Sequence, residues 1–240
     1  MSQPEGSFLR SFRLASLLAR GVVLRRGPGL LAGAAGVMLI LYLGMLLPGG
    51  TGGVFWLLYF VSLAGLLAWC LRACLEVLYP DAEGGRVGLG RYLWRMGLAW
   101  ALTALPALIV SMFVAALGEL ESNWVILQAL LAILIAAAGT AMWVVSSAKV
   151  AMTGDWRPTA AWRALQGGRF GALKAVVCVV LGAGIAVPIL LLPVLMLPEG
   201  SAVAWGLGFP LGALAHAGVG LALAAIGLGA VAALERVQPA

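Results

Sequence analysis

One histidine stands out among the residues that could serve a chemical function, because it lies within a long apolar run. His216 is the only histidine of the chain, and it falls near the middle of the sixth run. An imidazole titrates near neutral pH and can pass protons to a second ionisable group. No such group lies near His216 in the sequence. The sequence therefore favours an interhelical hydrogen bond for His216, and the alternative is a proton-sensing or substrate-contacting role.

Prolines in the last two apolar runs could interrupt helices. Pro188, Pro193 and Pro198 follow one another at five-residue spacing, and each removes a backbone donor and disturbs the helix one turn before it. Discontinuous helices form substrate sites in some transporters, but proline is also common in ordinary membrane helices. Pro188, Pro193 and His216 are therefore the candidate functional or packing residues.

Three cysteines give no pattern of a metal site or a disulfide framework. Cys70 and Cys74 share one face of a helix at i, i+4 spacing, and Cys178 lies far along the chain. A zinc site would require further histidine or cysteine ligands nearby. We predict that Cys70 and Cys74 are small packing residues, and we expect no metal and no cofactor.

Catalytic arrangements are hard to build from these runs. No aspartate or glutamate lies in the core of a run, so His216 lacks the orienting acid of a serine triad, and paired intramembrane aspartates do not occur. The glycine-rich stretch 84–90 has no P-loop lysine and is interpreted as a flexible lead into the next helix. We therefore expect that the protein is not an enzyme.

The composition indicates that lipid surrounds most of the chain. Hydrophobic residues make up 63% of the sequence and charged residues only 10%, whereas a soluble domain has roughly 25% charged residues. The apolar residues form six runs, and a bilayer span needs about 20 such residues. Backbone groups in lipid must be paired within the segment, which favours helices. We predict an all-α polytopic membrane helix bundle with six transmembrane helices in three hairpins.

The predicted segments repeat one plan three times. A basic, aromatic-bearing cytoplasmic segment leads into a span, a short outer turn and a second span. Residues 1–28 form the N-terminal amphipathic cytoplasmic segment, 29–236 the six-helix transmembrane domain and 237–240 the C-terminal tail. The spans are predicted at about 29–47, 54–75, 96–117, 124–148, 171–197 and 202–234.

Basic residues gather on one side of this six-span arrangement. All 15 fall on the side of the termini and of the second and fourth intervals, while the outer intervals contain only glutamates as charged residues. This positive-inside pattern predicts cytoplasmic termini and a bacterial or archaeal cytoplasmic (inner) membrane. The net charge of +6 is expected to meet anionic lipid headgroups and not nucleic acid. The arginines predicted to contact headgroups are Arg10, Arg13, Arg20, Arg91, Arg95, Arg163 and Arg169.

Residues 7–25 are predicted to form an amphipathic helix that lies on the membrane. Phe8 and Phe12 recur at helical spacing, and the arginines of this segment occupy a different face. The phenylalanine rings would insert among acyl chains while the arginines contact phosphates. The alternative is a solvated basic arm.

A motif pattern links the first cytoplasmic interval to the following span. Tyr79-Pro80-Asp81 is followed by a basic segment and then by Ala104-Leu105-Pro106 inside the span. With these motifs, the stretch 72–106 resembles the domain-of-unknown-function family 4013, small prokaryotic membrane proteins with paired spans and short cytoplasmic helices. The stretch 149–182 is compatible with a corresponding later unit. The same outline occurs in other six-span bacterial families, such as the membrane domain attached to some glycerophosphodiesterases. The resemblance implies a prokaryotic cytoplasmic-membrane protein and brings no catalytic residues.

Three classes of function stay open on this evidence. A non-catalytic subunit or scaffold of a membrane complex, partnered by other membrane subunits or by further copies of the chain, fits the short loops and the few intramembrane polar groups. A transporter or permease component fits the proline-rich fifth span and His216. An intramembrane enzyme has only His216 in its favour. We expect the first class, with the transporter as the alternative.

Overall fold

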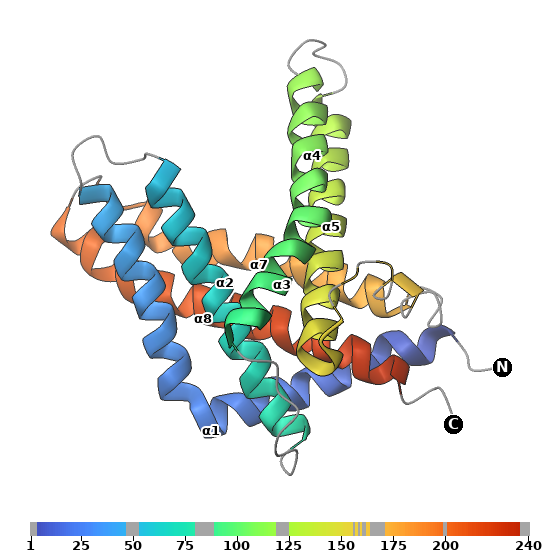
Figure 1. Cartoon of the computed structure of the whole chain (residues 1–240). Coiled ribbons are helices and arrows are strands. Elements are labelled where there is room, and N and C mark those ends of the chain that lie inside the picture. Colours follow the sequence, from blue (N-terminus) through green and yellow to red (C-terminus); the bar gives the residue numbers. More distant parts are fainter. Residues whose placement is uncertain are drawn as a thin grey trace.

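The computed structural model describes residues 4–46, 53–79, 89–118, 125–155, 157, 159, 162–163, 171–198 and 201–235. These residues are almost entirely helical, and no strand occurs among them, so the fold is all-α as predicted. The helices in chain order are α1 (Pro4–Leu46), α2 (Gly53–Leu78), α3 (Leu89–Leu102), α4 (Ala104–Gly118), α5 (Val125–Thr153), α7 (Gly171–Leu195) and α8 (Ala202–Glu235) (Figure 1).

Six stretches of the described helices are long and apolar enough to cross a bilayer, which confirms the predicted number of spans. Their mean hydropathy is between 1.7 and 2.8. The chain is therefore a multi-pass integral membrane protein. The stretches are Phe8–Gly44, Leu58–Leu78, Gly90–Val114, Ile126–Thr153, Gly171–Leu195 and Ala202–Ala233.

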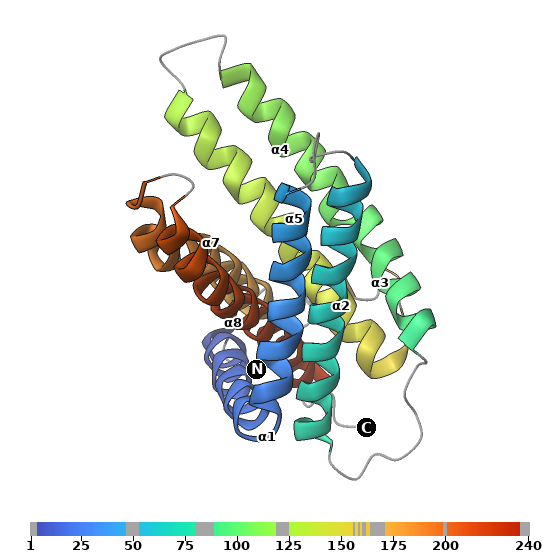
Figure 2. The ribbon, with the colours of Figure 1, turned by 90° about the vertical axis from the view of Figure 1, so that its left-hand side faces the viewer.

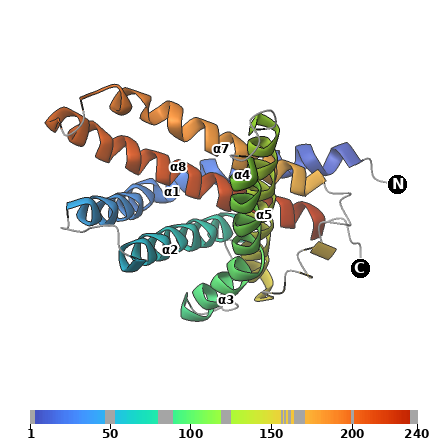
Figure 3. The ribbon, with the colours of Figure 1, turned by 90° about the horizontal axis from the view of Figure 1, so that it is seen from above.

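The helices form three hairpins that diverge from a common base. In Figure 1, α4 and α5 stand upright while α7 and α8 run across the picture, and Figure 2 shows α4 and α5 leaning away from α1 and α2. Seen from above, α2, the C-terminal part of α1 and most of α7 and α8 extend toward one side of the upright pair, whereas the N-terminal part of α1 and the C-terminal end of α8 extend toward the other (Figure 3). The α4–α5 hairpin therefore projects from the other spans.

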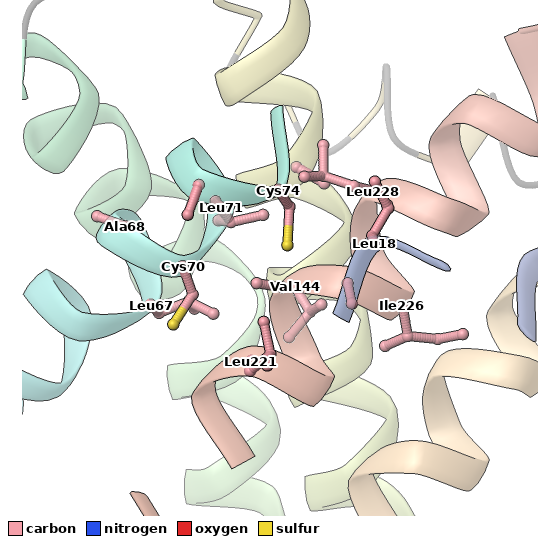
Figure 4. Packing of buried hydrophobic residues seen from close by; sticks show 14 of the residues in the cluster. Leu18, Leu67, Ala68, Cys70, Leu71, Cys74, Val144, Leu221, Ile226 and Leu228 are labelled. Atoms are coloured by element: carbon pink, nitrogen blue, oxygen red, sulfur yellow. The ribbon is translucent and has the colours of Figure 1, made fainter. Parts of the chain in front are cut away.

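The buried core lies where the hairpins converge. It combines residues from much of α1, the C-terminal halves of α2 and α5, most of α8, the first half of α3 and the beginning of α7. Side chains from four of these helices meet in Figure 4, among them Leu18, Leu71, Val144 and Leu228. Small residues let α8 approach its neighbours closely: a Cβ at Gly229 would lie 2.8 Å from the backbone oxygen of Ser11. Such contacts replace a hydrophobic driving force, which is weak between helices in lipid.

Helix α1 differs from the prediction of a separate surface segment followed by a span. It is continuous from Pro4 to Leu46 and bends along its length (Figure 1). Pro28 lies inside it, at the predicted boundary. A proline removes one hydrogen bond and kinks a helix, but the neighbouring backbone bonds allow the helix to continue. Helix α1 therefore does not end at the predicted boundary, residue 28.

The interrupted span is the third one, and not the fifth or sixth. Helices α3 and α4 are separated at Thr103, whose N–H bonds to the Trp100 oxygen at 3.2 Å. Pro106 explains the break, because it lacks the N–H that would pair with the Leu102 carbonyl. By contrast, α7 continues through Pro188 and Pro193, and α8 continues through its internal proline. The idea of a discontinuous fifth or sixth helix is therefore wrong.

Candidate functional site

The most distinctive polar contact in the membrane-spanning part joins α2 to α8. The Tyr59 hydroxyl lies 2.8 Å from Nε2 of His216, and Nδ1 of His216 lies 2.7 Å from the Gly212 carbonyl oxygen. A carbonyl oxygen only accepts hydrogen bonds, so Nδ1 carries a proton. In the neutral imidazole, Nε2 is then the acceptor and the Tyr59 hydroxyl is the donor. The predicted interhelical hydrogen bond of His216 is present.

This pair lies on the wall of a cavity of about 690 Å³ between α2, α3, α5, α7 and α8. A volume of this size is within the range of small-molecule sites, roughly 300–1,000 Å³. Aliphatic and aromatic side chains dominate the lining, and none of the lining residues that the structure describes is charged. The lining residues are Tyr59, Phe60, Val61, Leu63, Ala64, Leu66, Leu67, Leu93, Met96, Gly97, Trp100, Trp143, Val187, Ala215, His216, Val219, Gly220 and Leu223.

The cavity results from divergent helices and from small residues on its wall. The five helices separate beyond the core, and Gly97 adds no side chain to the space between them. A Cβ at Gly97 would meet no atom within 4 Å. On the opposite wall, a Cβ at Gly220 would approach Leu66 and Cys70 at 3.5–3.6 Å. The Trp143 indole N–H donates to the Met96 carbonyl oxygen at 3.2 Å and so holds α5 against α3.

The two candidate prolines do not belong to this site. Pro188 and Pro193 are exposed on α7, and neither lines the cavity, although the neighbouring Val187 does. These two prolines therefore act on the cavity only through the direction that α7 takes. Of the three candidate functional or packing residues, the structure brings only His216 into the cavity wall.

The arginines predicted to contact headgroups divide into two groups. Most of those described are exposed, which agrees with a position at the membrane surface: Arg10, Arg13, Arg20, Arg91 and Arg163. Arg95 is different, because its Nη1 donates to the Gly154 carbonyl oxygen at 2.7 Å. Gly154 has a φ of 74° and follows the end of α5, so Arg95 serves as a cap for that helix terminus. Arg169 lies outside the described residues.

The N-terminal part of α1 turns a different face to the core than predicted. Phe8 and Phe12 pack against core residues, with ring centroids 5.1 Å apart, and do not simply point into lipid. The outer apolar surface carries exposed leucines instead, at Leu9, Leu17 and Leu24. The reason is the length of α8: its 34 residues extend beyond the bilayer-length segment and cover the inner face of α1.

The predicted packing role of the first two cysteines is confirmed. Cys70 and Cys74 are free and buried in the core (Figure 4). Cys178 is also free, but it is exposed on α7.

Sequence reasoning missed Tyr59 as a site residue. It lies near the beginning of the second apolar run, where aromatic residues are typical of the membrane interface. A usable signal exists in hindsight, because a tyrosine inside an apolar run needs a partner for its hydroxyl. The other lining residues, such as Trp100 and Trp143, have no distinguishing signal in the sequence.

Fold and site together define the class of this molecule: an all-α multi-pass membrane protein with an apolar cavity and one hydrogen-bonded pair on its wall. Comparison with known proteins adds no relative, because no family model, no curated protein and no solved structure matches the chain.

Proposed function

We propose that this protein is a non-catalytic membrane protein that binds a lipid-like molecule in the cavity, as a transporter or permease component would. One observation carries the proposal: an apolar cavity of about 690 Å³ whose wall holds the Tyr59–His216 pair. Sites for small molecules combine this kind of apolar lining with a few polar groups that orient the ligand. Of the three classes of function first considered, ligand handling has the most specific support.

The chemistry of the wall supports binding without catalysis. The imidazole contacts a phenol and a backbone carbonyl, and the described part of the lining contains no carboxylate or amine that could work with it as acid or base. General acid–base catalysis needs such a group within hydrogen-bond reach of the substrate. The pair is therefore assigned a binding and orienting role.

Substitution of a wall glycine tests the proposal. Gly97→Leu adds a side chain where a Cβ meets open space on the cavity wall. Gly36→Leu is the matched control, because Gly36 is also helical with open space beside it but does not line the cavity. The protein, in phosphatidylcholine nanodiscs, is labelled with a diazirine-bearing long-chain alcohol, and labelled peptides are identified by mass spectrometry.

Saturable labelling of peptides from α2, α3 and α8 is expected in the wild-type protein and in Gly36→Leu. Gly97→Leu should reduce that labelling several-fold, because the added side chain occupies the ligand's space. Labelling that never saturates, or that spreads evenly over the exposed residues of α4 and α5, would mean that the probe only dissolves in the surrounding lipid. The proposal would then be wrong.

A second candidate function, a subunit of a membrane complex or a homo-oligomer, is favoured by the projecting α4–α5 hairpin. Within the described chain, α4 packs on α5 and adjoins α3, so most of its surface is left for lipid or for another protein. Ile109, Met112 and Phe113 are exposed there. Native mass spectrometry from nanodiscs tests it: a stable complex with another chain, or with further copies, is expected if this function is correct.

Membrane and orientation are assigned by charge. Basic residues lie at the beginnings of α1, α3 and α7 and near the ends of α2 and α5, all at the base where the hairpins converge. The positive-inside rule then assigns this base, with anionic headgroups around it, to the cytoplasmic face of a bacterial or archaeal inner membrane. The resemblance to the domain-of-unknown-function family 4013 points the same way and stays a prediction.

A further inference from the structure

We infer that the cavity selects uncharged lipid-like molecules that carry a hydroxyl group, an inference that rests on the proposed function of the same cavity. It deepens that function by naming the class of ligand. Two features of the cavity carry this inference: the direction of the hydrogen bonds at His216 and the absence of charge from the lining residues that the structure describes.

The hydrogen-bond directions begin at the backbone. The Gly212 carbonyl oxygen accepts from Nδ1 of His216 at 2.7 Å, which fixes the tautomer of the neutral ring. Nε2 is then an acceptor, and the partner 2.8 Å away is the Tyr59 hydroxyl. The phenolic proton is therefore directed at His216.

The direction of this hydrogen bond determines which ligand groups the Tyr59–His216 pair can bind. With its proton directed at Nε2, the Tyr59 oxygen can interact with a third group only as an acceptor. A ligand hydroxyl supplies the matching donor. A ketone or ether oxygen is an acceptor as well, and in an apolar site two acceptors that face each other leave both without a partner. The pair therefore favours an alcohol over a ketone or an ether.

The indole of Trp143, which also lines the cavity, does not change this preference. The N–H of Trp143 donates to the Met96 carbonyl oxygen, so that donor is already engaged with the backbone. The Trp100 indole also lines the cavity, and its N–H is the group that would donate to a ketone or ether ligand if the inference were wrong.

Charge and shape restrict the ligand further. Among the described lining residues there is no Lys, Arg, Asp or Glu, so a phosphate or carboxylate headgroup would enter without a counter-ion from them, at high cost. The lining is otherwise aliphatic and aromatic, which suits a hydrocarbon chain. A long-chain or polyisoprenoid alcohol meets both conditions.

Competition among three matched compounds tests the inference. The wild-type protein in phosphatidylcholine nanodiscs is labelled with the diazirine-bearing alcohol, and unlabelled dodecanol, dodecyl methyl ether and 2-dodecanone compete with it. Dodecanol is expected to displace the label at a concentration about three- to tenfold lower than the ether or the ketone, the worth of one net hydrogen bond. Lauric acid, ionised at neutral pH, should compete less well than dodecanol.

Two variants assign the preference to the pair. Tyr59→Phe alone leaves Nε2 of His216 as an acceptor, so the double variant Tyr59→Phe/His216→Leu is needed to remove both acceptors, and in it the alcohol should lose its advantage over the ether. His216→Leu releases the phenolic proton, so the ketone should gain on the alcohol. A preference for the alcohol that survives in the double variant would overturn the assignment. The wild-type series decides the matter even if a variant does not fold.

The outcomes separate the two proposals. If labelling is saturable but the three compounds compete equally, the cavity binds lipid-like molecules without regard to the hydroxyl, and only this inference is wrong. A preference for the ketone would mean that a donor such as the Trp100 N–H binds the ligand oxygen, and it would also overturn the inference. If labelling is not saturable at all, bulk acyl chains fill the cavity and the proposed function itself is wrong.

Discussion

The Tyr59 hydroxyl donates to Nε2 of His216 across 2.8 Å, although the two residues are 157 positions apart in the chain. This contact connects the first hairpin to the third at a level where α2 and α8 border the cavity. The rings are also in contact, with centroids 6.0 Å apart. Because water does not compete within a bilayer, such a pair links helices that apolar packing alone joins weakly.

The first prediction concerns the strength of this link. His216→Asn keeps hydrogen-bonding capacity and should be tolerated, whereas His216→Leu removes it and should lower stability by about 0.6–2 kcal/mol. The measurement is reversible denaturant unfolding in detergent. A double-mutant cycle with Tyr59→Phe isolates the pair, and a coupling energy near zero would show that the hydrogen bond does not hold α2 to α8.

The second prediction concerns the close approach of α1 and α8. A Cβ at Gly229 would lie 2.8 Å from the Ser11 backbone oxygen and 3.1 Å from the Ala15 nitrogen, and backbone atoms cannot move away cheaply. Gly229→Ala should therefore destabilise the protein by about 1–3 kcal/mol, as overpacking of a core does. Thermal unfolding in detergent measures the effect.

The control for this substitution is in the same helix. Gly218 is exposed, and a Cβ there would meet no atom within 4 Å. Gly218→Ala should leave stability unchanged or raise it slightly, because alanine is the better helix former. Equal effects of the two alanines would contradict the packing of α1 on α8.

The third prediction separates the two kinds of arginine. Arg95→Ala removes the cap of α5 and should cost about 1–2 kcal/mol, since its guanidinium donates to a helix-terminal carbonyl. Arg91→Ala, one turn earlier on an exposed position, should change stability by less than about 0.5 kcal/mol. Unfolding of both variants in the same detergent provides the comparison, and a matching loss in Arg91→Ala would refute the capping role.

The fourth prediction concerns orientation in the membrane. A cysteine at position 201, between α7 and α8, should react with an impermeant maleimide added to intact cells, and a cysteine at position 159 should be protected. Both are made in a chain whose exposed Cys178 is replaced by alanine, while buried Cys70 and Cys74 stay. The reverse pattern would place the basic base of the bundle outside. The further outer tips, at Gly50 and Ser122, and the inner segment at Gly85 lie outside the described residues.

Spans could be predicted from the sequence because bilayer thickness imposes a length and a composition on each helix. The apolar runs therefore located the six spans. The effect of a single proline on its helix was harder to predict from the sequence. Pro28 lies inside α1 without ending it, while Pro106 divides the third span. Whether a proline bends or breaks a helix depends on what packs around it, and Gly139, whose Cβ would meet Ala107, gives α5 a close fit against that break.

The cavity could not be predicted, because it depends on how the hairpins pack. His216 was recognisable as a polar residue in an apolar run, but its partner Tyr59 could be any of several aromatics until α2 and α8 were placed side by side. Gly97 illustrates the same limit, because a helix glycine gives no indication of whether its missing side chain leaves a cavity or admits another helix.

The last prediction concerns which face of α1 meets the lipid. Leu9 and Leu17 are 67% and 57% exposed, whereas Phe8 and Phe12 pack against the core. If the exposed face lies on the membrane, with its arginines reaching the headgroups, the leucines provide the immersed area. Replacing both leucines with serine should therefore raise the position of a spin label on this segment toward water, with little loss of stability.

Replacing both phenylalanines with serine should have the opposite pattern, a clear loss of stability with a smaller change in the depth of the spin label. Their rings contact each other and the core, so their loss should lower the free energy of unfolding by at least about 1 kcal/mol and at most several kcal/mol. The depth of the spin label, measured by collision with oxygen and with a water-soluble relaxant, should change less than in the leucine variant. If the phenylalanine variant changes immersion depth while the leucine variant does not, the rings are the membrane-inserted residues and the exposed leucines face water, contrary to the packing of α1 against α8.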